Sequence, residues 1–315
     1  MLRWDEWLMQ EVYHARPRIS SLATIRHSLR PMSENRRELE TGIHLDLRKG
    51  STYGDYLRLD ELLAAQRPVT DVHDEMLFII QHHTSELWIK LLIHELDHAV
   101  TLVRADRLPE SFKIFARVAH IQRMLFEQWA VLETMTPSEY LQFRDALGKA
   151  SGFQSYQYRA LEFVLGNKDA NTLKPHQHDP AIHAKLAARL QAPSLYDEFF
   201  GWLARHGHAI PDDRLTRDFT QPYAPSAAVL EVFRVIYAHP ERHYDAYDMC
   251  EKLVDIEERF QLWRFRHMTT VKRIIGFAHG TGGSSGVGFL KQALDLTFFP
   301  ELWEVRTLIA APARP

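Results

Sequence analysis

The chain of 315 residues is long enough to bury a large core, and 45% of its residues are hydrophobic, as in globular proteins. Its 38 lysine and arginine residues nearly balance its 41 aspartate and glutamate residues, so no overall positive charge indicates nucleic-acid binding. The single cysteine, Cys250, excludes an internal disulfide framework and any metal site built from several cysteines, and the lack of a run of about eighteen apolar residues argues against a transmembrane helix.

Residues 1–48 show no sustained hydrophobic period, and we expect a variable N-terminal extension there. Residues 49–315 are expected to form the folded domain. At its start, the leucines of TYGDYLRLDELLAAQRP predict a helix that begins near Thr52 to Asp55 and ends at Pro68.

Residues 73–103 are long and periodic enough to predict a single helix. Its main apolar stripe is expected to comprise Leu77, Ile80, Thr84, Leu87 and Leu91. Phe78, His82 and Ser85 lie on an adjacent face, so this helix is expected to contact the core on one side and a ligand on the other.

Residues 111–135 predict another long helix, and capping boxes follow it. Thr136 with Glu139 predicts a helix that ends at Gly148, in which Tyr140 and Arg144 lie one turn apart and face the same way. A second box at Ser151 and Gln154 predicts a helix that ends near residues 166 and 167.

The C-terminal half continues the helical pattern. We expect a short helix around residues 181–190, a helix capped by Ser194 and ended by Gly207, two helical segments at 227–239 and 241–263, and a last apolar segment at 288–308. No alternation of apolar and polar residues is long enough to predict a strand. The fold class is therefore expected to be all-α, as one large helical-bundle domain.

Residues 260–286 combine a helix with a glycine-rich segment. Apolar residues at steps of three and four place His267 in the middle of an apolar stripe, and Gly276 is expected to end the helix. His267 has two interpretations: a core histidine with a backbone partner, or a metal ligand, for which haem iron suits the apolar setting. GTGGSSG has no lysine and follows a helix, which excludes a P-loop. It is either a linker or a flexible loop whose Thr281 and serines close over a polar ligand.

HELDH, residues 94–98, matches the H-E-x-x-H pattern of zinc peptidases, with His94 and His98 as ligands and Glu95 as base. The match is short, and residues 99–104 offer neither the glycine nor the histidine of the longer pattern. The alternative interpretation is a solvated, charged helix end. A zinc-dependent hydrolase is kept as the alternative function, beside a non-catalytic helical module that binds proteins through Phe78 and the tyrosines.

Three blocks together resemble the tryptophan 2,3-dioxygenase family: HDEMLFIIQHHTSELW, SEYLQFRDALGKASGFQSYQYR and WRFRHMTTVKRIIGFAHGTGGSSG. The resemblance extends from about Thr52 to Leu308, in the order of the family. It implies an all-helical dioxygenase that holds haem b and inserts both atoms of O2 across the indole C2–C3 bond of L-tryptophan to give N-formyl-L-kynurenine, the first step of the kynurenine pathway. It also implies a homotetramer. Together with the composition, we expect a cytoplasmic protein without a nucleic-acid or membrane partner.

The resemblance implies a role for individual residues. His267 matches the axial ligand of the haem iron, and His82 matches the catalytic histidine that accepts the indole N–H. The residues that match substrate-binding positions are Phe78, Ile79, Ile80, Gln81 and His82 of the first block, Tyr140 and Arg144 of the second, Thr281 of the third, and Tyr53 and Tyr56 of an N-terminal segment that reaches a neighbouring subunit's site. Among them Arg144 matches the arginine that binds the substrate carboxylate.

Overall fold

The computed structural model describes residues 37–48 and 50–309. Within these residues it contains helices and no strand, which confirms the all-α expectation. The α-helices are α1 (Tyr53–Leu57), α2 (Leu59–Leu63), α3 (His73–Arg104), α4 (Leu108–Glu127), α5 (Trp129–Leu132), α6 (Pro137–Phe143), α7 (Tyr156–Leu165), α8 (Pro180–Gln191), α9 (Leu195–Arg205), α10 (Asp212–Leu215), α11 (Ala227–Ala238), α12 (Tyr244–Ile275), α13 (Val287–Gln292) and α14 (Pro300–Glu304). Short 3₁₀ helices are η1 (Arg144–Leu147), η2 (Gly152–Gln154), η3 (Ala170–His176), η4 (Ala293–Asp295) and η5 (Val305–Thr307). Among the described helices, none combines the length and apolar character needed to span a bilayer.

The chain divides into an N-terminal unit up to Asp60 and a larger unit from Glu61 onward. In the N-terminal unit, α1 begins within the predicted range, and the structure adds a capping box there, in which the Thr52 hydroxyl accepts from the backbone N–H of Asp55. Most of the expected extension, residues 1–36, lies outside the described residues. The domain boundary at residue 49 remains a prediction.

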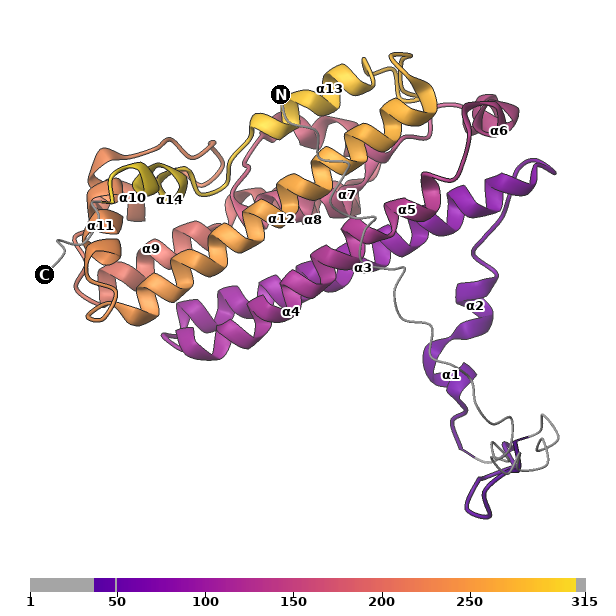
Figure 1. Cartoon of the computed structure of the whole chain (residues 1–315), viewed down its shortest axis with the longest axis horizontal. Coiled ribbons are helices and arrows are strands. Elements are labelled where there is room, and N and C mark those ends of the chain that lie inside the picture. Colours follow the sequence, from indigo (N-terminus) through magenta and orange to yellow (C-terminus); the bar gives the residue numbers. More distant parts are fainter. Residues whose placement is uncertain (1–36, 49, 310–315) are drawn as a thin grey trace, which may run out of the picture. The chain divides into compact units, whose positions relative to one another are not determined.

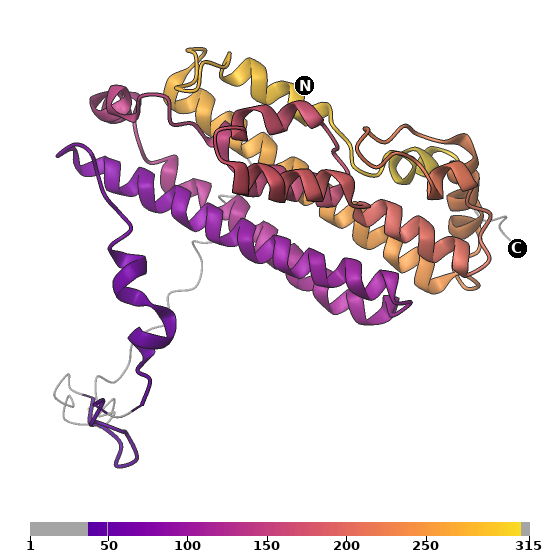
Figure 2. The same ribbon diagram turned by 180° about the vertical axis from the view of Figure 1, so that it is seen from behind.

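The larger unit is built around three long helices, α3, α4 and α12, in which α4 lies beside both of the others (Figure 1). The opposite view shows α7 and α9 packed along α3 (Figure 2). The core lies between these helices and is rich in aromatic side chains, of which Phe115, Phe163, Phe199, Phe200 and Phe233 are almost completely buried. This bundle positions the ends of α3 and α12 relative to each other.

The expected apolar stripe of α3 is wrong in part. Leu77 and Leu91 pack against the core, but Ile80 and Leu87 are 45% and 48% exposed. The buried side of α3 instead includes Gln81, whose backbone carbonyl accepts a hydrogen bond from the Ser85 hydroxyl. Because polar residues occupy part of the buried side, hydrophobic period alone placed the stripe on the neighbouring face.

Several helix boundaries also differ from the expectation. The helix begun at Thr136 ends at Phe143 and continues as η1, and the helix expected from Ser151 is η2 followed by α7. The segment predicted as one helix over residues 111–135 is interrupted at Gln128, which separates α4 from α5. Residues 241–263 and the helix of His267 join into α12, a single helix of 32 residues that ends at Gly276 as predicted. The predicted caps at Thr136 and Ser194 are confirmed, each as a full capping box.

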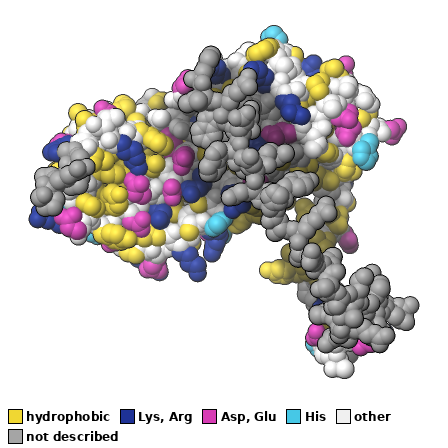
Figure 3. Space-filling model, in the orientation of Figure 1, with side chains coloured by type: hydrophobic (Ala, Val, Ile, Leu, Met, Phe, Trp, Pro, Cys, Tyr) yellow, Lys and Arg dark blue, Asp and Glu magenta, His cyan; other side chains and the backbone are white. Residues whose placement is uncertain are grey.

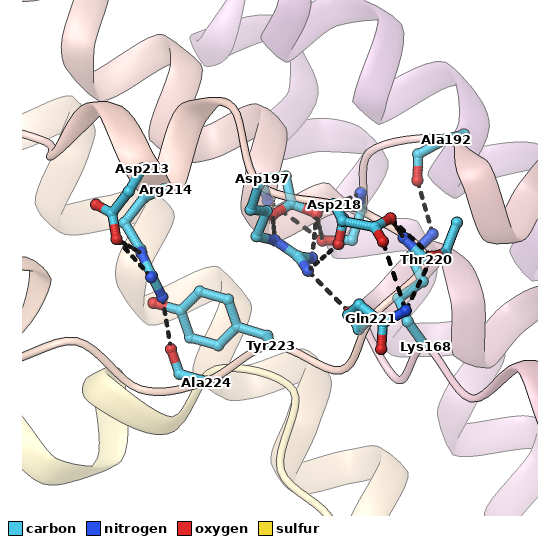
Figure 4. Close-up of polar contacts among 12 residues, drawn as sticks. Lys168, Ala192, Asp197, Asp213, Arg214, Asp218, Thr220, Gln221, Tyr223 and Ala224 are labelled. Atoms are coloured by element: carbon cyan, nitrogen blue, oxygen red, sulfur yellow. Dashed lines mark hydrogen bonds and ion pairs between the residues drawn. The ribbon is translucent and has the colours of Figure 1, made fainter.

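Polar contacts hold the peripheral helices in place. Lys168 is fully buried, and its ammonium donates to the carbonyls of Arg189 and Ala192 at the end of α8 (Figure 4). Burial lowers the pKa of Lys168 to about 7, against the opposing effect of the nearby carboxylate of Asp197. Asp197 itself is paired with Arg217 at 2.7 Å. On the face shown in Figure 3, hydrophobic side chains share the surface with both signs of charge, in agreement with the near-balanced composition.

Candidate active site

The predicted site residues of the larger unit gather where the first turns of α3, the helix α6 and the C-terminal part of α12 meet (Figures 1 and 2). The loop between α12 and α13 lies at the same end of the bundle. Segments far apart in the sequence therefore contribute to one region.

Phe78 and His82 form a pair on one face of α3, with ring centroids 4.2 Å apart. The Nδ1 atom of His82 lies 2.7 Å from the carbonyl oxygen of Phe78. Because a carbonyl can only accept, Nδ1 carries the hydrogen, which leaves the lone pair on Nε2 in the neutral ring. Burial lowers the pKa of His82, so the neutral form is favoured near pH 7. His82 can therefore accept a hydrogen bond from a ligand through Nε2.

Tyr140 of α6 and Arg144, the first residue of η1, extend this cluster, and they lie near each other as the one-turn spacing predicted. The Phe78 ring lies 5.9 Å from Tyr140 and 5.6 Å from Phe143 between ring centroids. Burial raises the pKa of the Tyr140 hydroxyl, and the nearby charge of Arg144 opposes this effect. One guanidinium nitrogen of Arg144, Nη2, donates to the carbonyl of His279 at 2.6 Å. Its Nε is buried and has no partner among the described residues, so it remains available for an anionic ligand.

The glycine-rich loop is held against this cluster by two bonds from side chains. One is the Arg144 bond to the His279 carbonyl, and in the other the Thr281 hydroxyl donates to the carbonyl of Ala150 at 2.5 Å. A Cβ atom on Gly282 would lie 2.7 Å from the Cβ of Ser151, so glycine permits close contact there. The loop is a defined part of the region and not a free linker.

His267 lies on α12 next to two indole rings that also contact each other, 5.8 Å from Trp263 and 4.8 Å from Trp129 between ring centroids. Burial lowers the pKa of His267 to about 4, and the nearby charge of His82 adds to the decrease, so the two imidazoles share one region. Neither ring nitrogen of His267 has a hydrogen-bond partner among the described residues, which disfavours the interpretation as a core histidine with a backbone partner. A neutral imidazole without a partner can bind a metal.

The remaining predicted residues are less clearly placed. Gln81 is buried and its amide nitrogen has no partner among the described residues, whereas Ile79 is half-buried. Ile80 lies on the other side of α3 from Phe78 and is largely exposed. Tyr53 and Tyr56 belong to the N-terminal unit, where their side chains are 76% and 81% exposed.

The HELDH segment does not form a zinc site. Both carboxylate oxygens of Glu95 accept from Arg117 at 2.7 Å, so the expected base is already paired. His94 and His98 are exposed. Within residues 37–48 and 50–309, no three metal-binding side chains come together in a group that could hold an ion. The interpretation as a solvated, charged segment fits the two histidines but not Glu95, which is buried and paired with a residue of α4.

The family model described as tryptophan 2,3-dioxygenase matches residues 37–235 and 227–309 of this chain. The chain belongs to the tryptophan 2,3-dioxygenase family. A tryptophan 2,3-dioxygenase of Myxococcus xanthus is 65% identical over 284 residues, which cover 90% of this chain and 98% of the relative. One of Serratia proteamaculans is 61% identical over 279 residues, which cover 88% of this chain and all of the relative. One of Xanthomonas campestris is 56% identical over 287 residues, which cover 90% of this chain and 96% of the relative.

These similarities confirm the predicted family and make the chain an enzyme of the oxidoreductase class. The family match begins at residue 37, before the expected boundary at 49. The alternative function as a zinc hydrolase is unsupported. Membership of an enzyme family also argues against the alternative of a non-catalytic protein-binding module.

Three features of the site were not predicted from the sequence. Trp129 fell within the helix predicted over residues 111–135 without being named as a site residue, and Phe143 was not singled out although it packs on Phe78. The loop contacts through the carbonyls of Ala150 and His279 involve backbone atoms, which every residue has. No sequence pattern distinguishes those two positions.

A separate cleft of about 500 Å³ lies between α4 and α12, and its lining does not include His82 or His267. Its basic side chains Arg123 and Arg259 are already paired with acidic residues one turn away on their own helices. One polar atom of its lining, Oε1 of Gln122, is buried and has no partner among the described residues, so the cleft differs from the site described above in which residues line it and not in the absence of such atoms.

Proposed function

We propose that this chain binds haem b through His267 and inserts both atoms of O2 across the indole C2–C3 bond of L-tryptophan, giving N-formyl-L-kynurenine. Family membership supports the reaction. The observation that carries the proposal for this chain is the buried, unpaired Nε of Arg144 in the cluster that Tyr140 connects to Phe78 and His82, because these groups fit a ligand with a carboxylate and an aromatic N–H.

The residues around His267 fit a haem. Its imidazole is neutral, has no hydrogen bond to a described residue and packs against two indole rings. A single nitrogen donor without carboxylate or thiolate neighbours suits the axial position of haem iron better than a closed zinc site. When bound, haem would supply the chemistry of oxygen activation, which the side chains of the site lack.

The protein's own contribution would be to bind and orient L-tryptophan. Arg144 would hold the carboxylate through Nε while Nη2 keeps its bond to the His279 carbonyl. The Thr281 hydroxyl donates to Ala150, so its oxygen lone pairs remain free to accept from the substrate ammonium. These bonds would couple substrate binding to the closed position of the loop.

At the other end of the substrate, His82 would accept the indole N–H through Nε2, and Phe78 would pack on the ring. His82 would orient the indole and not deprotonate it, because an indole N–H is far too weak an acid for neutral imidazole in the ground state. Tyr140 would line the pocket. Ile79 and Gln81 are further proposed substrate-side residues through their place in the same block, with Gln81 the better supported because its amide nitrogen is buried and unpaired. The expected role of Ile80 in this pocket is not proposed, because its side chain lies on the opposite side of α3 and is exposed.

We further propose a cytoplasmic homotetramer in which Tyr53 and Tyr56 reach the site of a neighbouring subunit. The high exposure of both tyrosines supports their contact with a partner. Cross-linking from a photoreactive residue at position 56 would test this proposal, and labelling within one chain only would contradict it.

The reaction is tested with purified, full-length protein, L-tryptophan and 18O2. Two labelled oxygen atoms in N-formyl-L-kynurenine, one haem per chain and a Soret band that shifts with L-tryptophan would support the proposal. A product without both labelled atoms, or stoichiometric zinc in place of haem, would contradict it. A His267→Ala variant serves as the control for the iron ligand, and it should lose stable haem while remaining folded.

A further inference from the structure

Trp129 lies almost parallel to His267, although the two residues come from different helices. Their ring centroids are 4.8 Å apart and their planes differ by 13°. Trp129 is 5% exposed. Its indole N–H is buried without an acceptor among the described residues, so packing, and not a hydrogen bond, holds this ring in place.

The short helix α5 that carries Trp129 is fixed to α12 on both sides. Arg266, next to His267, donates from Nη1 to the carbonyl of Phe126, which precedes Trp129. Its Nε and Nη2 donate to the two carboxylate oxygens of Glu133, which follows Trp129, at 3.0 and 3.1 Å. One side chain therefore brackets the segment that contains Trp129.

Two more bonds complete this bracket. The hydroxyl of Thr270 donates to Glu133 at 2.9 Å, so Glu133 is bound to residues on both sides of His267 along α12. Gln128, the residue before Trp129, donates to the Ser85 hydroxyl of α3 at 2.8 Å. Because α5 is attached to both long helices, the Trp129 ring cannot slide relative to His267 without loss of these bonds.

A histidine that binds a metal usually donates its other ring N–H to a carboxylate or carbonyl, which fixes the plane of the ring. No such acceptor for His267 exists among the described residues. The parallel face of Trp129 is the alternative means of fixing this plane, because rotation of the imidazole would push it into the indole.

We propose that Trp129 is a positioning residue for the iron ligand: it fixes the ring plane of His267 by stacking, and the Glu133–Arg266 pair holds Trp129 in place. This inference rests on the proposed haem ligation by His267. It assigns to three side chains outside the substrate pocket a role in the geometry of the metal bond.

The test compares Trp129→Leu with Trp129→Phe in the haem-loaded, full-length protein. The leucine variant removes the flat face, and we expect about tenfold faster haem loss to excess apomyoglobin and a shifted or broadened iron–histidine band in the resonance Raman spectrum. The phenylalanine variant keeps a flat face and loses an indole N–H that has no partner. It should restore both readings to nearly those of the unmodified protein.

Trp202 provides a matched control. It is also 5% exposed, its indole N–H is also unpaired among the described residues, and it stacks on His206 at 4.0 Å and 19°. It lies on α9, away from the C-terminal part of α12 (Figure 1). Trp202→Leu should lower stability without moving the iron–histidine band, which separates positioning from general packing.

The outcomes are distinguishable. An unchanged band and haem-loss rate in Trp129→Leu, or the same changes in Trp202→Leu, would overturn the inference while leaving haem ligation intact. If Trp129→Leu does not fold, Glu133→Gln takes its place: it should shift the band in the same direction by less, and an unchanged band would overturn the inference. A haem spectrum that survives in His267→Ala would instead contradict the proposed function itself.

Discussion

The substitution Gly282→Ala is expected to weaken tryptophan binding, because it would force the glycine-rich loop away from Ser151. The Cβ of Gly282→Ala would lie 2.7 Å from the Cβ of Ser151 and 2.9 Å from its Oγ. Ordinary contacts of this kind begin near 3.4 Å, so the two segments must separate by about 0.7 Å. The φ angle of Gly282 is not positive, so steric contact and not backbone strain is the cause.

Overpacking of this size typically costs about 1–3 kcal/mol. The loop can avoid this cost by moving outward, but it then loses the Thr281 bond to Ala150 and the Arg144 bond to His279. Since both bonds hold the groups proposed to bind the substrate, we expect KM for L-tryptophan to rise by about 5- to 150-fold, with little change in thermal stability.

The assay is initial rate against L-tryptophan concentration, with the dissociation constant measured independently from the Soret shift. Ser151→Gly removes both atoms that the new methyl group would meet, so the double variant should recover most of the lost affinity. Ser151→Gly alone measures the loss of the Ser151 cap on η2. An unchanged KM in Gly282→Ala, or no recovery in the double variant, would refute the idea that close packing of Gly282 against Ser151 positions the loop for substrate binding.

Three further predictions concern single side chains. Arg144→Lys keeps the charge but loses the planar fork, so KM should rise at least about tenfold, or about 1.4 kcal/mol, and an unchanged KM would place the carboxylate elsewhere. His82→Ala should keep measurable turnover at a kcat/KM lowered by about tenfold, because one orienting hydrogen bond is lost; complete loss with haem and substrate still bound would indicate obligatory base catalysis. Lys168 is neutral in the fold above about pH 7 but charged in the unfolded chain until about pH 10.5, so folding releases a proton in this window. Relative to Lys168→Met, the free energy of unfolding of the unmodified protein should therefore rise between pH 7 and 9 by up to about 1.4 kcal/mol per pH unit in denaturant titrations. Parallel pH profiles of the two proteins would contradict the lowered pKa of Lys168.

Much of the helical architecture could be predicted from short-range chemistry. Thr136, Ser194 and Gly276 mark helix ends because capping bonds join residues three or four apart, and such bonds are visible in the local sequence. The pairing of Phe78 with His82 also follows from the helical repeat, once the segment is assigned as a helix.

Long-range packing accounts for the errors. The stripe assigned to α3 included Ile80, which is exposed, because partner helices and not hydrophobicity decide which of two overlapping faces is covered. HELDH matched a zinc pattern, but Glu95 is paired with Arg117, which lies on α4. Neither outcome is encoded in the spacing of nearby residues.

The amino-acid order alone was sufficient to identify the helices, the family blocks and the individual side chains with the right chemistry for a site. It could not show that Trp129 lies against His267. Nor could it show that Arg144 donates to the carbonyl of His279 or that Thr281 donates to the carbonyl of Ala150. Those contacts join positions more than a hundred residues apart, and they depend on how whole helices pack. Local hydrogen bonding can be recognised in a short window, whereas the choice of a distant partner depends on the folded chain.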